Sequence, residues 1–394
     1  MPNTRLVFLD WARILAFGLL VLYHVGMYYV SWDWHIKSPH AGGALEPFMR
    51  LLSPWRLGLL FLVSGAATSF MLARTGAGGS LLATRARRLL IPLAFGMLVI
   101  VPPQAYLEVV HKYAYAGGYL DFMRLYLAGY GGFCGPRGCL ILPTWNHLWF
   151  LPYLFAYTLV LWGLLRAWPR LLEAGRPLAG ARLFVWPLLF LLLTRLALRE
   201  RFPVTHALVD DWFSHSQYLA LFLLGALLAR SPAAWERMMH ARYAALALGL
   251  AAWALLGFEP ARPFTWSVLQ WCGIVAAIGF ARRHLNRDGV LRRYLADAVF
   301  PVYILHQTLT ILLASALAWR AYAPALEGAL LVAGTFGLAF LGYECARRLR
   351  WARPLLGLKP GPAPAASLPA SARAWRARRC APGPSRGRGS ACAR

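Results

Sequence analysis

Residues 14–30 read ILAFGLLVLYHVGMYYV, an apolar run in which His24 is the only residue with a basic side chain. A second run, LLFLVSGAATSFMLA, occupies residues 59–73. Both approach the roughly 20 apolar residues that an α-helix needs to cross a bilayer core of about 30 Å. Because backbone groups that face lipid must be hydrogen-bonded within their own segment, these runs predict membrane-spanning helices.

The composition extends this prediction to the whole chain. Hydrophobic residues make up 59% of its 394 residues and charged residues only 14%, which is not the composition of a soluble protein. The fold class predicted is therefore all-α: a polytopic membrane helical bundle of about ten transmembrane helices. The predicted spans are 6–30, 51–73, 89–107, 148–166, 183–199, 216–230, 243–258, 264–280, 295–317 and 326–345.

The basic residues predict how the bundle is oriented. The net charge is +26, but the basic residues alternate between loops instead of gathering on one soluble face, which argues against nucleic-acid binding. Alternate loops, at 74–88, 166–182, 230–242 and 282–293, hold sixteen arginines, whereas the opposite set is longer and much poorer in Lys and Arg. Since positive loops stay in the cytoplasm, both termini are predicted to be cytoplasmic in a multi-pass protein of the inner (plasma) membrane.

The sequence also predicts a division into two domains and one long exterior stretch. Residues 1–358 are predicted to form the membrane-embedded domain, and residues 359–394, rich in Pro, Ala, Gly, Ser and Arg, a disordered basic cytoplasmic tail that touches membrane lipid. The largest exterior stretch, about 108–147, contains Cys134 and Cys139 with four residues between them. It also contains an apolar piece at 120–127 that we expect along the membrane surface. A disulfide and two unpaired thiols are both compatible with this spacing.

The first span has a polar stripe. At about 100° per residue, Arg13 and His24 differ by only about 20° around the helix, and Asp10 and Tyr28 fall within about 60° of the same line. Charged groups at this depth are costly and commonly face a cavity or a partner. His24, toward the exterior, could remove a proton from a hydroxyl, and Arg13 could hold a phosphate or carbonyl from the cytoplasmic side. The structural alternative is an Asp10–Arg13 ion pair with a hydrogen-bonded core histidine.

Further candidates lie in other spans. Each has a structural alternative: His147 as an interfacial residue, Arg195 as a snorkelling side chain, and Glu344 as the partner of nearby arginines. No cysteine and histidine spacing resembles a metal site. The substrate-binding candidates are Ser64, Trp149, Tyr303, His306 and Glu344, with Gln307 beside them.

Several of these motifs resemble the acyltransferase-3 family of membrane acyltransferases. The similar stretches are Leu9-Asp10-Trp11-Ala12-Arg13 with His24 eleven residues after the arginine, Leu60 to Gly65, and Val302 to His306. His147-Leu148-Trp149-Phe150-Leu151 and Arg353 to Leu358 look most like the branch that contains glucan biosynthesis protein C. Together these motifs cover residues 5 to about 358. One departure is the absence of the glutamate that many O-antigen acetylases have after the Trp motif, where this chain has Pro152 and Tyr153.

The resemblance implies O-acyl transfer from a cytoplasmic acyl-CoA donor, succinyl-CoA or acetyl-CoA, to hydroxyls of an extracytoplasmic glycan such as periplasmic glucan, with no bound cofactor. His24 and Arg13 carry over as the essential pair, and Asp10 is grouped with them as catalytic. A polytopic transporter or lipid-linked sugar flippase would also be a helical bundle with an internal polar stripe. It would be expected to show internal repeats or broken helices, and the two halves of the chain show no convincing similarity.

Overall fold

The structure is a computed structural model, and it describes residues 6–75, 79–135, 138–173, 180–258, 262–320 and 322–359. These residues form helices almost throughout, in one compact unit that ends at Leu358. The predicted tail after Lys359 lies outside the described residues and stays a prediction. The helices are α1 (Val7–Tyr29), α2 (Glu46–Thr75), α3 (Gly79–Phe95), α4 (Pro102–Tyr113), α5 (Tyr119–Leu127), α6 (Phe150–Ala167), α7 (Arg182–Leu198), α8 (Trp212–Leu228), α9 (Pro232–Ala254), α10 (Arg262–His284), α11 (Val290–Leu317), α12 (Pro324–Arg348) and α13 (Ala352–Leu355), with a π-helical turn η2 (Gly96–Ile100) and short 3₁₀ turns η1 (Gly43–Leu45), η3 (Asn146–Trp149), η5 (Leu255–Gly257) and η7 (Ala318–Arg320).

Seven helical segments in the described chain are long and apolar enough to cross a membrane: those containing α1, α2, α6, α9, α10, α11 and α12. An eighth would be the pair Ser80–Ile100 and Pro102–Tyr113, which bends by 43°. The π-helical turn and the two prolines that start α4 explain the bend, because prolines supply no N–H to continue the hydrogen-bond ladder. All ten predicted segments fall on helices, but the count of ten spans is not confirmed.

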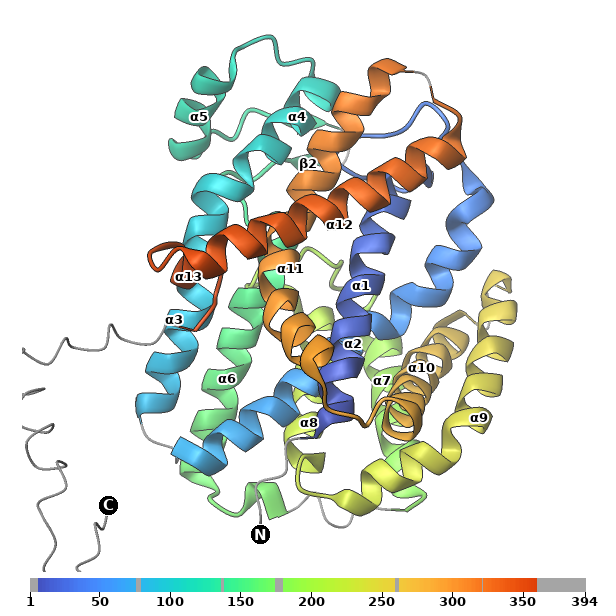
Figure 1. Cartoon of the computed structure of the whole chain (residues 1–394). Coiled ribbons are helices and arrows are strands. Elements are labelled where there is room, and N and C mark those ends of the chain that lie inside the picture. The colour runs from blue at the N-terminus through green and yellow to red at the C-terminus, as the bar shows by residue number, and fades with distance from the viewer. Residues whose placement is uncertain are drawn as a thin grey trace, which may run out of the picture. The chain divides into compact units, whose positions relative to one another are not determined.

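Helix α1 lies in the middle of the bundle, with α2, α10 and α11 beside it and α12 crossing obliquely (Figure 1). The first turns of α1 are joined by side-chain hydrogen bonds and an ion pair to the start of α11 and the residues just before it. Arg292 donates to Asp10, the Trp11 indole N–H donates to the carbonyl of Arg287 at 3.2 Å, and Arg13 Nη2 donates to the carbonyl of Ala296 at 3.0 Å. The opening motif of the chain therefore joins residues about 280 positions apart.

Close packing of α2 on α8 explains the glycine of the second-span motif. A Cβ on Gly65 would lie 1.8 Å from the carbonyl oxygen of Phe222, and one on Gly225 would lie 1.9 Å from that of Leu62. Only residues without a side chain allow two backbones to come this close. Gly65 thus brings α2, and the polar residues earlier on it, against α8.

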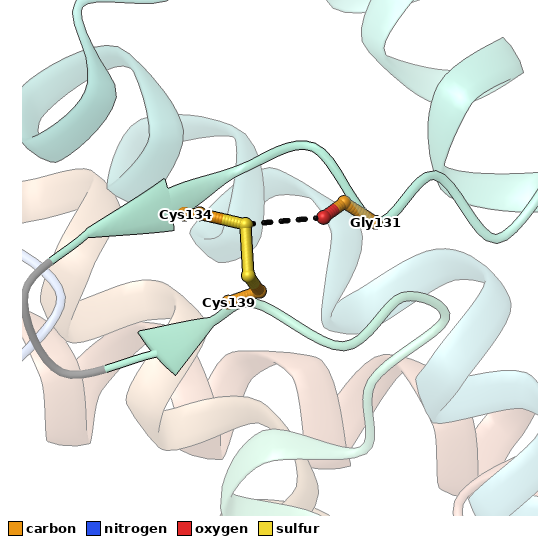
Figure 2. The surroundings of a disulfide bond; sticks show 3 residues. All are labelled: Gly131, Cys134 and Cys139. Carbon is orange, nitrogen blue, oxygen red and sulfur yellow. Dashed lines mark hydrogen bonds between the residues drawn. A yellow bond between two sulfur atoms is a disulfide. The ribbon is translucent and has the colours of Figure 1, made fainter.

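The largest predicted exterior stretch is mostly ordered structure. It contains the end of α4, then α5, then a hairpin of two short antiparallel strands, β1 (Cys134–Gly135) and β2 (Gly138–Cys139). Cys134 and Cys139 form a disulfide across the hairpin, and the Cys134 sulfur lies 3.3 Å from the carbonyl oxygen of Gly131 (Figure 2). Of the two alternatives left open by the sequence, the disulfide is therefore the one present.

Candidate active site

The centre of the candidate site is a pair of histidines from the first and the eleventh helices. His24 Nδ1 lies 2.7 Å from His306 Nε2, and the two ring planes are only 4° apart. His306 is fully buried, and its other nitrogen, Nδ1, lies 2.6 Å from the carbonyl oxygen of Tyr303. Two segments separated by more than 280 residues therefore meet at one hydrogen bond.

This geometry fixes which nitrogens carry protons. A carbonyl oxygen only accepts, so Nδ1 of a neutral His306 must be the donor to Tyr303 and its Nε2 must be the acceptor. The proton shared with His24 then belongs to His24 Nδ1. What remains on His24 is Nε2 with its lone pair, and this is the tautomer that a general base needs.

His24 borders a cavity of about 420 Å³ between the helices. Its wall is largely aromatic, including the rings of Trp149 and Tyr303, and His147 also faces it. The volume falls within the range of small-molecule sites, and an aromatic lining with a few polar groups suits a sugar or an acyl chain. The cavity therefore brings a histidine base together with space for a substrate.

Three arginines also line this cavity: Arg56 of α2, and Arg195 and Arg199 at the end of α7. Arg56 is almost fully buried, and its guanidinium lies 3.7 Å from the centre of the Tyr23 ring. Arg195 donates to Gln270 and Ser267 at 3.0 and 3.3 Å. The described residues that line the cavity include no aspartate or glutamate, so these cations face a site without a neutralising carboxylate.

One edge of the cavity is closed by the loop between α7 and α8. His206 of this loop stacks on Trp149, with ring centroids 4.0 Å apart and planes 14° apart. Asp211 Oδ2 accepts from the backbone N–H of His206 and from the Tyr153 hydroxyl, which holds the loop in place. Burial lowers the pKa of His206 to about 4, against the opposing effect of Asp211, so this imidazole is uncharged at neutral pH.

A chain of polar side chains lies behind the histidine pair, and it was not among the predicted site residues, apart from His147 and Gln307. Gln104 lies 3.4 Å from His147 Nδ1 and accepts from Gln307, and Gln307 also lies 2.9 Å from His35. His35 in turn is hydrogen-bonded to Glu108. The signal available was the four-residue spacing of Gln104 and Glu108 on an amphipathic helix, which places both on one face.

The predicted site residues separate into three groups. His24, Trp149 and Tyr303 line the cavity, as does His147, which is buried instead of interfacial. His306 contacts His24 and is not among the residues that line this cavity, so its predicted contact with substrate stays a prediction.

The remaining predicted residues lie elsewhere. Ser64 is on α2 outside the cavity lining. Glu344 forms ion pairs with Arg347 and Arg348 near the end of α12, which was its structural alternative. Asp10 is paired closely with Arg292, while Arg13 lies 3.9 Å from Asp10 and donates to the carbonyl of Ala296. Both belong to the opposite end of α1 from His24, at axial offsets of roughly 16 Å for Arg13 and 21 Å for Asp10 at 1.5 Å per residue.

Two cavity arginines differ from expectation. Arg195 does not snorkel to a surface but packs near Phe213 and Trp266. Arg56 was missed, although an arginine at the sixth residue of the predicted span 51–73 was a visible signal. Among the described residues, no cluster of three His, Cys, Asp or Glu side chains could hold a metal ion.

Apolar helices long enough to span a membrane, around a cavity lined by a histidine and three arginines, are typical of a multi-pass membrane protein with a polar site inside its bundle. The acyltransferase-3 family model, described as an acyltransferase domain, matches residues 6–344. The chain belongs to this family and is a membrane acyltransferase. Comparison with curated proteins and comparison with solved structures found no match.

Proposed function

We propose that the protein transfers an acyl group, succinyl or acetyl, from a cytoplasmic acyl-CoA donor to a hydroxyl of a glycan outside the inner (plasma) membrane, with periplasmic glucan as a candidate acceptor. Family membership supports acyl transfer. The histidine at an aromatic cavity supports a hydroxyl acceptor, because a hydroxyl must lose its proton to attack a thioester.

The proposed reaction assigns one role to each end of α1. His24 Nε2 takes the proton of the glycan hydroxyl, whose oxygen bonds to the thioester carbonyl carbon. The carbon–sulfur bond then breaks, and the CoA thiolate leaves and takes up a proton. Arg13 holds a phosphate or carbonyl of the donor on the cytoplasmic side, which requires the amino terminus to be cytoplasmic. An even number of spans, such as the ten expected, places the carboxyl terminus on the same side.

The observation that carries this proposal is the tautomer of His24, with Nδ1–H held by His306 and Nε2 left as a base at the cavity. We expect His24→Ala in proteoliposomes to lower acyl transfer from labelled acyl-CoA to glycan by about 10² to 10⁴-fold, because a general base contributes that much. The matched control is His240→Ala, since His240 is 72% exposed on α9.

Near-normal transfer by His24→Ala would remove His24 from the mechanism. A wild-type protein that moves glycan across the membrane without acylating it would instead favour a flippase. Mass spectrometry of the glycan distinguishes these results, because each added acyl group changes its mass.

A further inference from the structure

The positive charge of the cavity is not explained by the role of His24 as a general base. Arg56, Arg195 and Arg199 line it, and the described lining residues include no carboxylate. Cations at membrane depth usually face a partner or a functional cavity. A neutral sugar or a neutral acyl chain would not need such a concentration of positive charge.

Among the described residues, Arg56 differs from Arg292, the other arginine that is almost fully buried. Arg292 is 2% exposed and contacts two carboxylates, those of Asp10 and Asp288. Arg56 is 3% exposed, has the Tyr23 ring as its neighbour, and has two buried nitrogens, Nε and Nη1, without a hydrogen bond. Buried polar groups are nearly always hydrogen-bonded, so these donors lack the partner that Arg292 has.

Arg195 lines the same cavity, and its hydrogen-bond partners there are neutral groups. It donates to the Gln270 side-chain oxygen and the Ser267 hydroxyl, and its guanidinium lies 5.2 Å from the centre of the Phe213 ring. These contacts fix the orientation of the side chain while leaving its charge unneutralised. A side chain oriented in advance in this way loses little freedom when it binds an anion.

We propose that Arg56 and Arg195 form a subsite for a carboxylate of the substrate, in the same cavity as His24. The planar guanidinium fork matches a carboxylate, and the proposal rests on the proposed acyl transfer. Two sources would supply the same group: the far end of a dicarboxylic acyl chain, or a uronate residue of the acceptor glycan. In either case the subsite selects a charged substrate over its neutral analogue.

The test is binding to the detergent-solubilised full chain, measured by isothermal titration calorimetry with two matched pairs of probes. Monomethyl succinate against methyl butyrate represents the acyl source, and methyl glucuronide against methyl glucoside represents the acceptor source. We expect the charged member of one pair to bind at least about tenfold more tightly than its neutral partner. The pair that shows this preference identifies the source.

Variants connect the preference to the arginines. Arg56→Gln should remove most of the charged-probe preference and leave the neutral probe unchanged, whereas Arg56→Lys should keep part of it. Arg124→Gln is the control, because Arg124 is 83% exposed on α5. If Arg56→Gln does not accumulate, Arg195→Gln makes the same test. His24→Ala should keep the preference, so binding is scored even where no transfer occurs.

Two results would overturn the subsite. One is equal affinity for the charged and neutral members of both pairs in the wild-type protein. The other is an Arg56→Gln variant in which both members of the preferred pair weaken by the same factor, which would mean that Arg56 shapes the cavity without recognising charge.

Discussion

Replacing His306 by leucine tests whether this histidine acts through His24. In the structure His306 Nε2 accepts the His24 Nδ1 proton at 2.7 Å. Leucine fills similar space but cannot accept, so the buried N–H would lose its partner at a cost of about 1–3 kcal/mol. His24 can avoid that cost by moving its proton to Nε2, which blocks the base. One to three kcal/mol corresponds to a loss of about 5- to 150-fold in kcat.

The assay is the initial rate of acyl transfer in proteoliposomes over a range of acceptor concentrations. We expect kcat to fall and KM to stay near the wild-type value, because His306 does not line the cavity. His306→Gln is the matched variant, since its amide can accept from His24 and donate to the Tyr303 carbonyl, and it should keep most of kcat. Equal loss in the leucine and glutamine variants, or a raised KM with normal kcat, would refute the reasoning.

Three other predictions concern packing, pH and sidedness. Gly65→Ala should lower thermal stability by about 1–3 kcal/mol because its Cβ would overlap the α8 backbone, while Gly18→Ala, with open space at its Cβ, should not, as measured by thermal unfolding in detergent. The pKa of His206 is about 4 in the folded protein and 6.5 when the side chain is exposed, so between these pH values the unfolded state binds more protons than the folded state. The free energy of unfolding should therefore be about 2 kcal/mol lower at pH 5 than above pH 6.5, and His206→Phe should remove that part of the pH dependence. In a variant whose tail cysteines are serine, a membrane-impermeant thiol reagent should label the reduced Cys134–Cys139 pair in intact cells, and should label Cys345 only after lysis. The opposite pattern would reverse the predicted topology.

The sequence predicted what depends on local periodicity. Hydropathy placed the apolar helices, and the helical repeat placed Arg13 and His24 on one stripe of α1, where His24 does face the cavity. It did not predict the bend between α3 and α4, because a hydropathy window averages across the prolines that cause it.

Contacts between distant segments could not be predicted in the same way. Periodicity grouped Asp10 with Arg13, but Asp10 also pairs closely with Arg292, 282 positions away. The partner of His24 is equally distant, and only the folded bundle brings the two histidines together. Arg56 was overlooked because one charge within a long apolar window hardly changes its mean hydropathy, although that charge is costly in free energy.

The role of Arg13 can now be separated from that of Asp10. Arg292 supplies the close ion pair of Asp10, so neutralising Asp10 does not depend on Arg13, whose side chain is 27% exposed and donates to the Ala296 carbonyl. If Arg13 grips phosphate or carbonyl oxygens of the donor, Arg13→Lys should lose the planar fork and weaken donor binding by about 10- to 100-fold, since hydrogen bonds to charged groups contribute about 1.5–3 kcal/mol.

Titrating a non-hydrolysable acyl-CoA analogue into solubilised protein measures this directly. His24→Ala should leave donor affinity nearly intact because it lies at the other end of α1, and Arg293→Lys is the surface control, with a side chain 60% exposed. Arg292→Lys should instead reduce accumulation of the protein in the membrane, because it disrupts the ion pair with Asp10 that joins α11 to α1. A wild-type donor affinity in Arg13→Lys would leave Arg13 with a structural role alone, and the donor would then have to be held by other residues.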